Sequence, residues 1–151
     1  MDDVNVLLRH AIQLERDAAR RFEELADSMR TAGNDEVERL FRRLGEFSRR
    51  HLELAVARSG FRDLPEISHD EFQWPDGITP EAALWTGVDG VIDARGALEV
   101  ALEGERTGHA FYDAVAKQTR DPEVSRVAHS FAEEEAQHVS ELERWLKRID
   151  A

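Results

Sequence analysis

The chain has 151 residues, a length that suits one domain whose core is large enough to be stable without disulfides or other cross-links. It contains no cysteine, so disulfides, thiolate nucleophiles, thiolate metal sites and iron–sulfur clusters are excluded, and any metal must be held by oxygen and nitrogen. Twenty Lys and Arg stand against 32 Asp and Glu, a net charge of −12 that disfavours nucleic acid and anionic membranes as partners. The acidic start Met1-Asp2-Asp3 and the lack of a long apolar run lead us to expect a cytoplasmic protein.

Apolar residues recur at three- and four-residue steps over residues 3–59, with one break. Gly33 in that break is expected to end the first helix, and Asn34 or Asp35 to cap the second. The pattern therefore predicts a helical hairpin.

Residues 60–90 have a different composition, with three prolines, two tryptophans and several glycines. Neighbouring helices in a bundle are usually joined by about 2–8 residues. A link of this length is long enough to cross the bundle from end to end, and its aromatic residues favour packing on the helices over disorder. We predict an ordered crossover connection.

The helical pattern returns over residues 91–149, interrupted only at Asp121-Pro122, which supply an N-cap and a proline at a first helical position. A second hairpin is predicted. Residues 1–151 are thus expected to form a single all-α domain, a four-helix bundle of two hairpins.

The two hairpins repeat each other. An offset of 90 residues places Glu15 on Glu105, and an offset of 87 places His51 on His138, the difference falling in the turn between helices. Each hairpin then has an inward Glu on its first helix and an inward His on its second, the arrangement by which four helices converge on one site.

The fourth helix carries Glu135-Ala136-Gln137-His138, in which a carboxylate and an imidazole lie about one helical turn apart and can point at one metal ion. One such pair is usually solvated surface. The matching positions on the other three helices make a shared site the stronger interpretation, because several buried ionisable groups need a compensating charge.

These motifs resemble those of the rubrerythrin-like branch of the ferritin-like superfamily. Members are carboxylate-bridged di-iron four-helix bundles in which helices one and three each give a Glu and helices two and four each give Glu-x-x-His. The match covers both hairpins, most of the chain outside residues 60–90. On this resemblance the metal ligands are Glu15, His51, Glu105, Glu135 and His138. Tyr112, two turns after Glu105, matches a family tyrosine that hydrogen-bonds a ligand carboxylate.

The second helix departs from the family pattern, because Ser48 stands three residues before His51, where a bridging Glu is expected. The remaining carboxylates balance only three of the four charges of an Fe(II) pair, so a second ion should bind more weakly. His109 lies one turn after Glu105, whereas the additional Glu of rubrerythrins falls on Gly108. The site is expected to be mononuclear, or asymmetric and dinuclear with His109 or water completing it.

The resemblance implies a non-haem iron protein, with manganese as the second choice of metal. Its expected activity is Fe(II) oxidation by peroxide or oxygen, with peroxide reduction. The family's rubredoxin tail, which feeds electrons through an iron site of four cysteines, is missing, so an external electron donor is expected. Family members often pair, so a homodimer is also an expectation.

A metal-free bundle that acts as an interaction or scaffold protein is the competing interpretation. In it, Arg16, Arg49 and Arg106, which adjoin the inward positions, would neutralise the buried carboxylates. The other histidines fit no site geometry and are expected on the surface: His10, His69 and His129.

Overall fold

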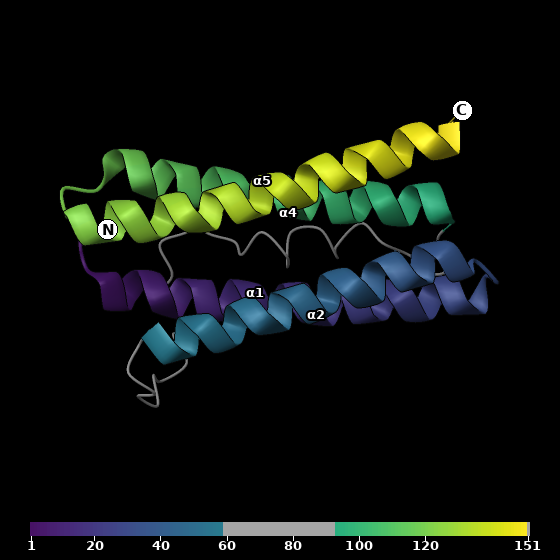
Figure 1. The fold of residues 1–151 in the computed structure, drawn as a ribbon, viewed down its shortest axis with the longest axis horizontal. Coiled ribbons are helices and arrows are strands. Elements are labelled where there is room, and N and C mark those ends of the chain that lie inside the picture. Colours follow the sequence, from purple (N-terminus) through teal and green to yellow (C-terminus); the bar gives the residue numbers. More distant parts are fainter. Residues whose placement is uncertain (59–92, 151) are drawn as a thin grey trace.

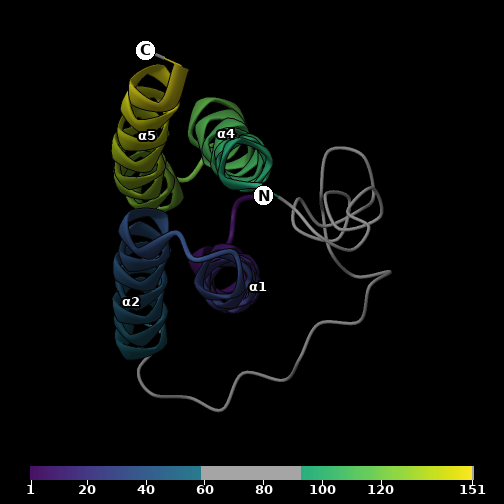
Figure 2. The same cartoon turned by 90° about the vertical axis from the view of Figure 1, so that its right-hand side faces the viewer.

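The computed structural model describes residues 1–58 and 93–150. Four long helices make up nearly all of this part of the chain: α1 (Val4–Thr31), α2 (Asp35–Arg58), α4 (Ala94–Gln118) and α5 (Pro122–Asp150). Helix α1 packs along α2, and α4 along α5, as two antiparallel hairpins (Figure 1). Viewed along the bundle, α1 lies next to α4 and α2 next to α5 (Figure 2). The predicted all-α bundle of two hairpins is confirmed, whereas the predicted crossover lies outside the described residues.

The turn between α1 and α2 follows from its sequence as predicted. Gly33 has φ +76°, a conformation that glycine adopts without steric cost. The N–H groups of Gly33 and Asn34 donate to the carbonyls of Arg30 (3.1 Å) and Met29 (2.9 Å), the pattern of a Schellman C-cap. The Asn34 side chain then accepts from the Val37 N–H at 3.1 Å, so it caps the start of α2.

Aspartates begin the other three helices. Asp3 accepts from the Asn5 N–H at 2.8 Å, and Asp93 accepts from the Gly96 N–H at 2.7 Å. Asp121 accepts from two N–H groups of the first turn of α5, at 2.9 and 3.0 Å. The third helix therefore starts at Ala94, slightly later than the expected residue 91, because Asp93 is its cap.

The core consists of two apolar clusters, one towards each end of the bundle. Each cluster takes residues from all four helices. The first is built on Leu7, Leu8, Leu14, Phe111, Tyr112 and Phe131. The second is built on Phe22, Leu25, Met29, Phe41, Leu98 and Leu142. On every helix the two clusters are separated by buried polar residues, so the bundle contains a polar layer across its middle.

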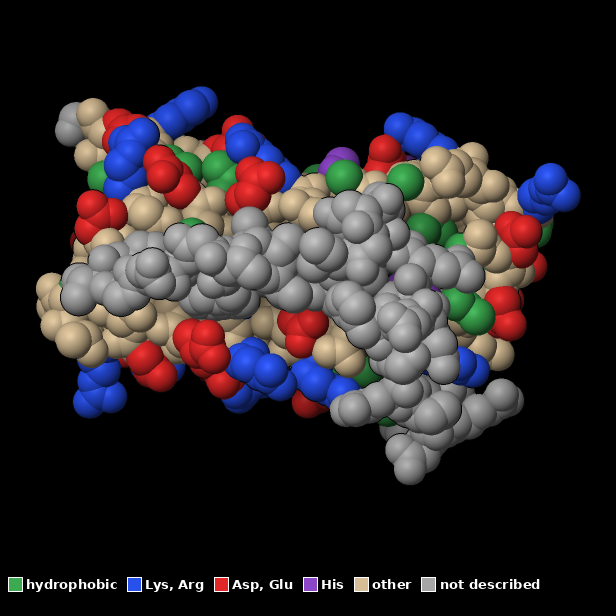
Figure 3. Space-filling model, turned by 180° about the vertical axis from the view of Figure 1, so that it is seen from behind, with side chains coloured by type: hydrophobic (Ala, Val, Ile, Leu, Met, Phe, Trp, Pro, Cys, Tyr) green, Lys and Arg blue, Asp and Glu red, His purple; other side chains and the backbone are tan. Residues whose placement is uncertain are grey.

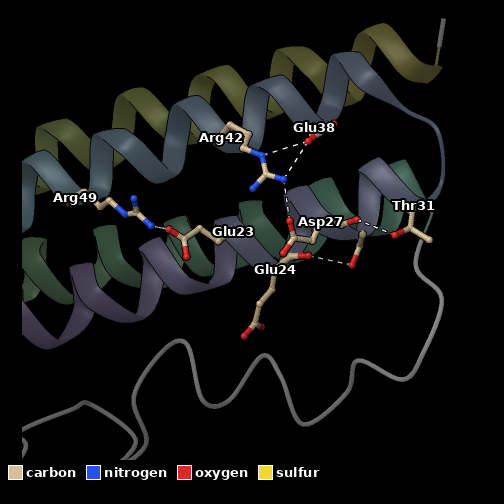
Figure 4. A network of polar contacts seen from close by, with 8 residues as sticks. Glu23, Glu24, Asp27, Thr31, Glu38, Arg42 and Arg49 are labelled. Carbon is tan, nitrogen blue, oxygen red and sulfur yellow. Dashed lines mark hydrogen bonds and ion pairs between the residues drawn. The ribbon is translucent and has the colours of Figure 1, made fainter.

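The outer face of the first hairpin is held by ion pairs (Figure 4). Arg42 on α2 reaches Asp27 at 2.8 Å and Glu38 at 3.0 Å, and Arg49 pairs with Glu23. Exposed pairs of this kind each contribute about 0–1 kcal/mol, so packing of the core matters more for holding the helices together.

Acidic and basic side chains are interspersed over the described part of the back surface (Figure 3). None of the described helices combines the length and the apolar character needed to cross a bilayer.

Candidate metal centre

The five residues predicted as ligands all lie in the polar layer, and all are buried. Their exposed fractions are 3% for Glu15, 4% for His51, 3% for Glu105, 2% for Glu135 and 5% for His138. The helical repeat explains this placement, because each residue continues the apolar stripe of its helix. The structure thus brings the predicted set into the interior, and its role in binding metal stays a prediction.

The closest group of donors in the described residues comes from the second hairpin. One ligand atom each from Glu105, Glu135 and His138 lie within 4.8 Å of one another. Metal–ligand bonds of about 2.0–2.2 Å put the donors of one ion within about 4.4 Å of each other, so small side-chain rotations would close this group around an ion.

Each hairpin places a glutamate at the same distance from a histidine. Nδ1 of His51 lies 3.6 Å from Oε1 of Glu15, and Nδ1 of His138 lies 3.6 Å from Oε2 of Glu105. The two imidazole rings are nearly parallel, at 13°, with their centroids 6.1 Å apart. The repeat in the sequence is therefore also a repeat of the site, with one Glu–His pair in each hairpin.

The carboxyl of Glu135 interacts electrostatically with the glutamate of each pair. Burial raises the pKa of Glu135 well above 4.5, and the nearby carboxylates of Glu105 and Glu15 raise it further. Burial also acts to raise the pKa of Glu105, but Glu135, His138 and then Arg21 outweigh it and lower that pKa to about 2. Without metal, Glu135 therefore holds a proton more tightly than Glu105 does.

Burial acts to lower the pKa of His138, but the carboxylate of Glu105 outweighs burial, so the net shift is upward. The cluster of carboxylates therefore favours positive charge at this position, whether a proton or a metal ion carries it.

Several polar atoms in this layer lack a hydrogen-bond partner within the described part of the chain. They include Oε2 of Glu135 and both ring nitrogens of His138. An unpaired buried polar atom costs about 1–3 kcal/mol, so a feature that satisfies these atoms together is strongly favoured. A divalent cation does so, because carboxylate oxygens and imidazole nitrogens are its usual ligands. The residues present therefore fit a metal ion.

Ser48 lies in the same layer at 1% exposure and contributes no charge. A carboxylate that the sequence did not predict lies nearby: Oε2 of Glu134, on α5, is 3.1 Å from Nε2 of His51, without a hydrogen bond within the described residues. Glu134 is at the rim of the layer, with 32% of its side chain exposed. The sequence held only a weak signal, because Glu134 is the middle of three consecutive glutamates, and their spacing along the helix singles out Glu135.

Arg21 is the second residue that the sequence analysis missed. Its side chain is fully buried on α1, and its Nη2 donates to Oε1 of Glu105 at 3.0 Å. The signal was its spacing, since Arg21 lies three residues after Ala18 and four before Leu25 on the inward stripe.

The arginines predicted as neutralising partners do not enter the layer, so that expectation is wrong. All three are exposed. Arg49 pairs with Glu23, and Arg106 lies 3.9 Å from Glu143. One helical step of about 100° separates Arg16 and Arg106 from their buried neighbours, which is enough to turn a long side chain to solvent.

Tyr112 is fully buried beside the layer, yet its hydroxyl has no hydrogen-bond partner among the described residues. Burial raises the pKa of Tyr112 well above 10, and the carboxylates of Glu15 and Glu135 raise it further. The expected hydrogen bond to a ligand carboxylate is not present in this structure.

The residues considered on α4 beyond Glu105 differ in how close they come to the donors. His109 is partly buried and lies outside the group of three donors. Gly108 is closer, because a Cβ atom on it would lie 3.7 Å from Oε2 of Glu135. The backbone of α4 therefore passes next to the central carboxyl where rubrerythrins have an additional Glu.

His10 corrects another expectation, because it is buried and not on the surface. Its Nδ1 donates to the Val6 carbonyl at 2.8 Å, and its ring stacks on Phe111 with the centroids 5.8 Å apart. Burial lowers the pKa of His10 and outweighs the hydrogen bond to Val6, which acts to raise it. A histidine with one local hydrogen bond packs as an aromatic core residue. His129 is exposed as expected, and His69 lies outside the described residues.

Comparisons with known proteins identify the family of the chain. The family model described as Rubrerythrin matches residues 7–69 and 96–151, ranges that contain all five predicted ligands. The crystal structure of an uncharacterized conserved protein from Magnetospirillum magnetotacticum MS-1 is similar, with 34% sequence identity and a TM-score of 0.77. The similarity covers 93% of this chain and 91% of that one. A search of curated proteins gave no match.

Proposed function

Because the chain belongs to the rubrerythrin family, we propose that it is a non-haem iron protein that oxidises Fe(II) with peroxide or oxygen at its buried polar layer. The observation that supports this proposal is the group formed by Glu105, Glu135 and His138. Its donor atoms are buried, close together and, for His138, without hydrogen-bond partners within the described residues. The family implies a metal-binding site, usually iron, and this group is suited to hold the ion.

Carboxylate oxygens and imidazole nitrogens suit both Fe(II) and Mn(II), so manganese is the alternative metal. Glu105, Glu135 and His138 are the proposed ligands in the second hairpin, and Glu15 and His51 are the corresponding candidate donors in the first. The raised pKa of Glu135 favours a proton on this carboxyl, and a metal ion must displace that proton when Glu135 becomes a ligand, so protonation and metal binding compete.

Bound iron supplies one-electron redox chemistry towards peroxide or oxygen. Reduction of hydrogen peroxide to two waters takes two electrons and two protons. None of the 151 residues is cysteine, so this chain has no thiolate iron site to feed electrons. An external electron donor is therefore part of the proposal.

The metal-free scaffold is retained as a second candidate because of the Arg21–Glu105 ion pair. One guanidinium balances one of the three buried carboxylates at Glu15, Glu105 and Glu135, and a proton on Glu135 balances another. A bundle neutralised in this way needs less help from a metal ion.

Metal analysis of protein from iron-replete cells, followed by anaerobic addition of Fe(II) to chelator-treated protein, separates the two candidates. We expect bound iron and, at Fe(II) about 100-fold above its Kd, a stabilisation of about 2.7 kcal/mol. This corresponds to a rise in melting temperature of roughly 5–10 °C.

Peroxide consumption then tests the chemistry. The iron-loaded protein should consume peroxide when a reductant is supplied, whereas the Zn(II)-loaded protein should not, because zinc has no redox chemistry. Protein that contains no metal, and whose melting temperature does not change when Fe(II) is added, would support the metal-free scaffold instead.

A further inference from the structure

Arg21 is the feature of the polar layer that the proposed ligand set leaves unexplained. It places a fully buried guanidinium among carboxylates, 3.0 Å from Glu105 and with its Cζ 4.6 Å from the ring centroid of Phe22. The offset of 90 residues that relates the first helices of the two hairpins places Arg21 on Phe111, a buried apolar residue. Arg21 is thus an asymmetric addition to a repeated layer.

We propose that Arg21 limits the site to one divalent ion per chain, bound by Glu105, Glu135 and His138, and takes the place of a second ion. This inference rests on the proposed metal binding and specifies its stoichiometry.

The charges of the buried layer support one ion and not two. Glu15, Glu105 and Glu135 supply three negative charges when ionised, and Arg21 supplies one positive charge, so the layer is neutral with a single divalent ion. Glu134 at the rim is partly exposed, so water screens its charge when it is unbalanced. When Glu134 is counted, the wild-type layer still lacks one negative charge for two divalent ions, whereas a layer without Arg21 lacks none. An unbalanced charge in a buried site is strongly disfavoured.

The contacts of the two Glu105 oxygens also favour one ion per chain. Oε1 accepts a hydrogen bond from Arg21, and Oε2 faces Nδ1 of His138 at 3.6 Å. In the common bridging mode each carboxylate oxygen binds one ion, and Oε1 of Glu105 already accepts a hydrogen bond from a cationic guanidinium, which disfavours a second cation at that oxygen. Ser48 supplies no carboxylate to replace Glu105 from α2.

The charge of Arg21 is also permanent. A metal ion can displace the proton of a buried carboxylic acid or imidazole, but a guanidinium does not lose its proton in proteins. A metal ion that enters the layer must therefore share it with Arg21.

The test is a metal count on wild type and two arginine variants. Arg21→Met removes the buried charge and keeps an unbranched apolar side chain. Arg106→Met makes the same chemical change next to Glu105, but at an exposed position. Each protein is freed of metal with a chelator and dialysed to equilibrium against Mn(II), and the bound metal is counted. We expect one ion per chain for wild type and for Arg106→Met, and two for Arg21→Met.

Arg21→Lys, which retains the charge, should also bind one ion. If Arg21→Met does not fold, Arg21→Leu carries the test, because it also removes both the charge and the hydrogen bond to Glu105, and two ions are again expected. Two ions on wild type, or one ion on the folded neutral variants, would overturn the role of Arg21 while leaving metal binding intact. No Mn(II) or Fe(II) on any of these proteins would instead overturn the proposed function.

Discussion

The two hairpins share one layout but differ in chemistry. Each places a Glu on its first helix 3.6 Å from a His on its second, between the same two apolar clusters. The second hairpin adds Glu135, whereas the first has Ser48 at the equivalent position. The backbone repeat is thus retained while the donors are concentrated in α4 and α5, so the halves of the site should differ in affinity.

A second difference lies one residue earlier, where the offset of 87 residues places Phe47 on Glu134. The Phe47 ring packs edge-on against both imidazoles, 4.5 Å from His51 and 4.7 Å from His138 between centroids. Glu134 instead lies 3.1 Å from Nε2 of His51. A carboxylate from the second hairpin therefore approaches the histidine of the first, although Oε2 of Glu134 makes no hydrogen bond within the described residues. No equivalent contact reaches Nε2 of His138, which has no hydrogen-bond partner in this part of the chain.

The largest effect should come from removing one histidine at a time. His138→Ala removes a donor from the group of three and should weaken Mn(II) binding by more than about 100-fold, beyond the 10–100-fold typical of partners that only support a ligand. His51→Ala should weaken Mn(II) binding by less than about 10-fold. The first hairpin has too little negative charge to hold an ion tightly, because Ser48 adds no carboxylate and Arg21 adds a positive charge. Calorimetric titration measures both, with His129→Ala as the exposed control. Equal losses for the two histidines would mean that the halves are equivalent.

Much of the fold could be predicted because its signals are local. Gly33, Asn34 and Asp121 mark helix ends through their own backbone and side-chain hydrogen bonds, and the structure places each of them as expected. The apolar stripe likewise identified which face of each helix is buried. Residues 60–90 offered no comparable local pattern, and the crossover predicted there lies outside the described residues.

The site was predictable where a charged residue shares the face of its apolar neighbours, as Glu15 does beside Leu14 and Ala18. It was not predictable where the side chain's direction depends on a neighbouring helix. Arg21 points into the core, where it forms an ion pair with Glu105 on α4. Glu134 points towards the layer, where its carboxylate meets His51 on α2. Spacing along one helix does not contain these contacts.

A smaller effect is the pH dependence of stability that Glu135 should give the second hairpin, and that Ser48 at the equivalent position of the first cannot give. The folded pKa of Glu135 is raised, so its contribution to the stability of the metal-free protein is fully present below about pH 4.5 and is lost as pH rises through the folded pKa. Glu105 behaves in the opposite way, because its pKa of about 2 means that its contribution is lost as pH falls through about 2.

Glu135→Gln keeps a neutral side chain at every pH. In chelator, this variant should melt above wild type at pH 8 by more than the roughly 2–4 °C that 1 kcal/mol represents in a chain of this size, and close to wild type at pH 4.5. Glu133→Gln, at an exposed neighbouring position, is the control and should follow wild type. A constant difference across the pH range would contradict a raised pKa for Glu135.

The smallest effect concerns Tyr112, whose equivalent in the first hairpin is Phe22. Tyr112→Phe makes the two positions alike and keeps the ring contacts with Phe111 and Phe131, at 5.4 and 5.2 Å between centroids. It removes a buried hydroxyl that has no hydrogen-bond partner among the described residues, so the metal-free protein should gain about 1 kcal/mol in free energy of unfolding by urea. Phe22→Tyr, the reverse change in the other hairpin, should lose at least as much, because a hydroxyl is added to a packed apolar cluster. A loss of stability in Tyr112→Phe would mean that the hydroxyl does pair with a carboxylate of the layer, and would make Tyr112 one more feature by which the second hairpin differs from the first.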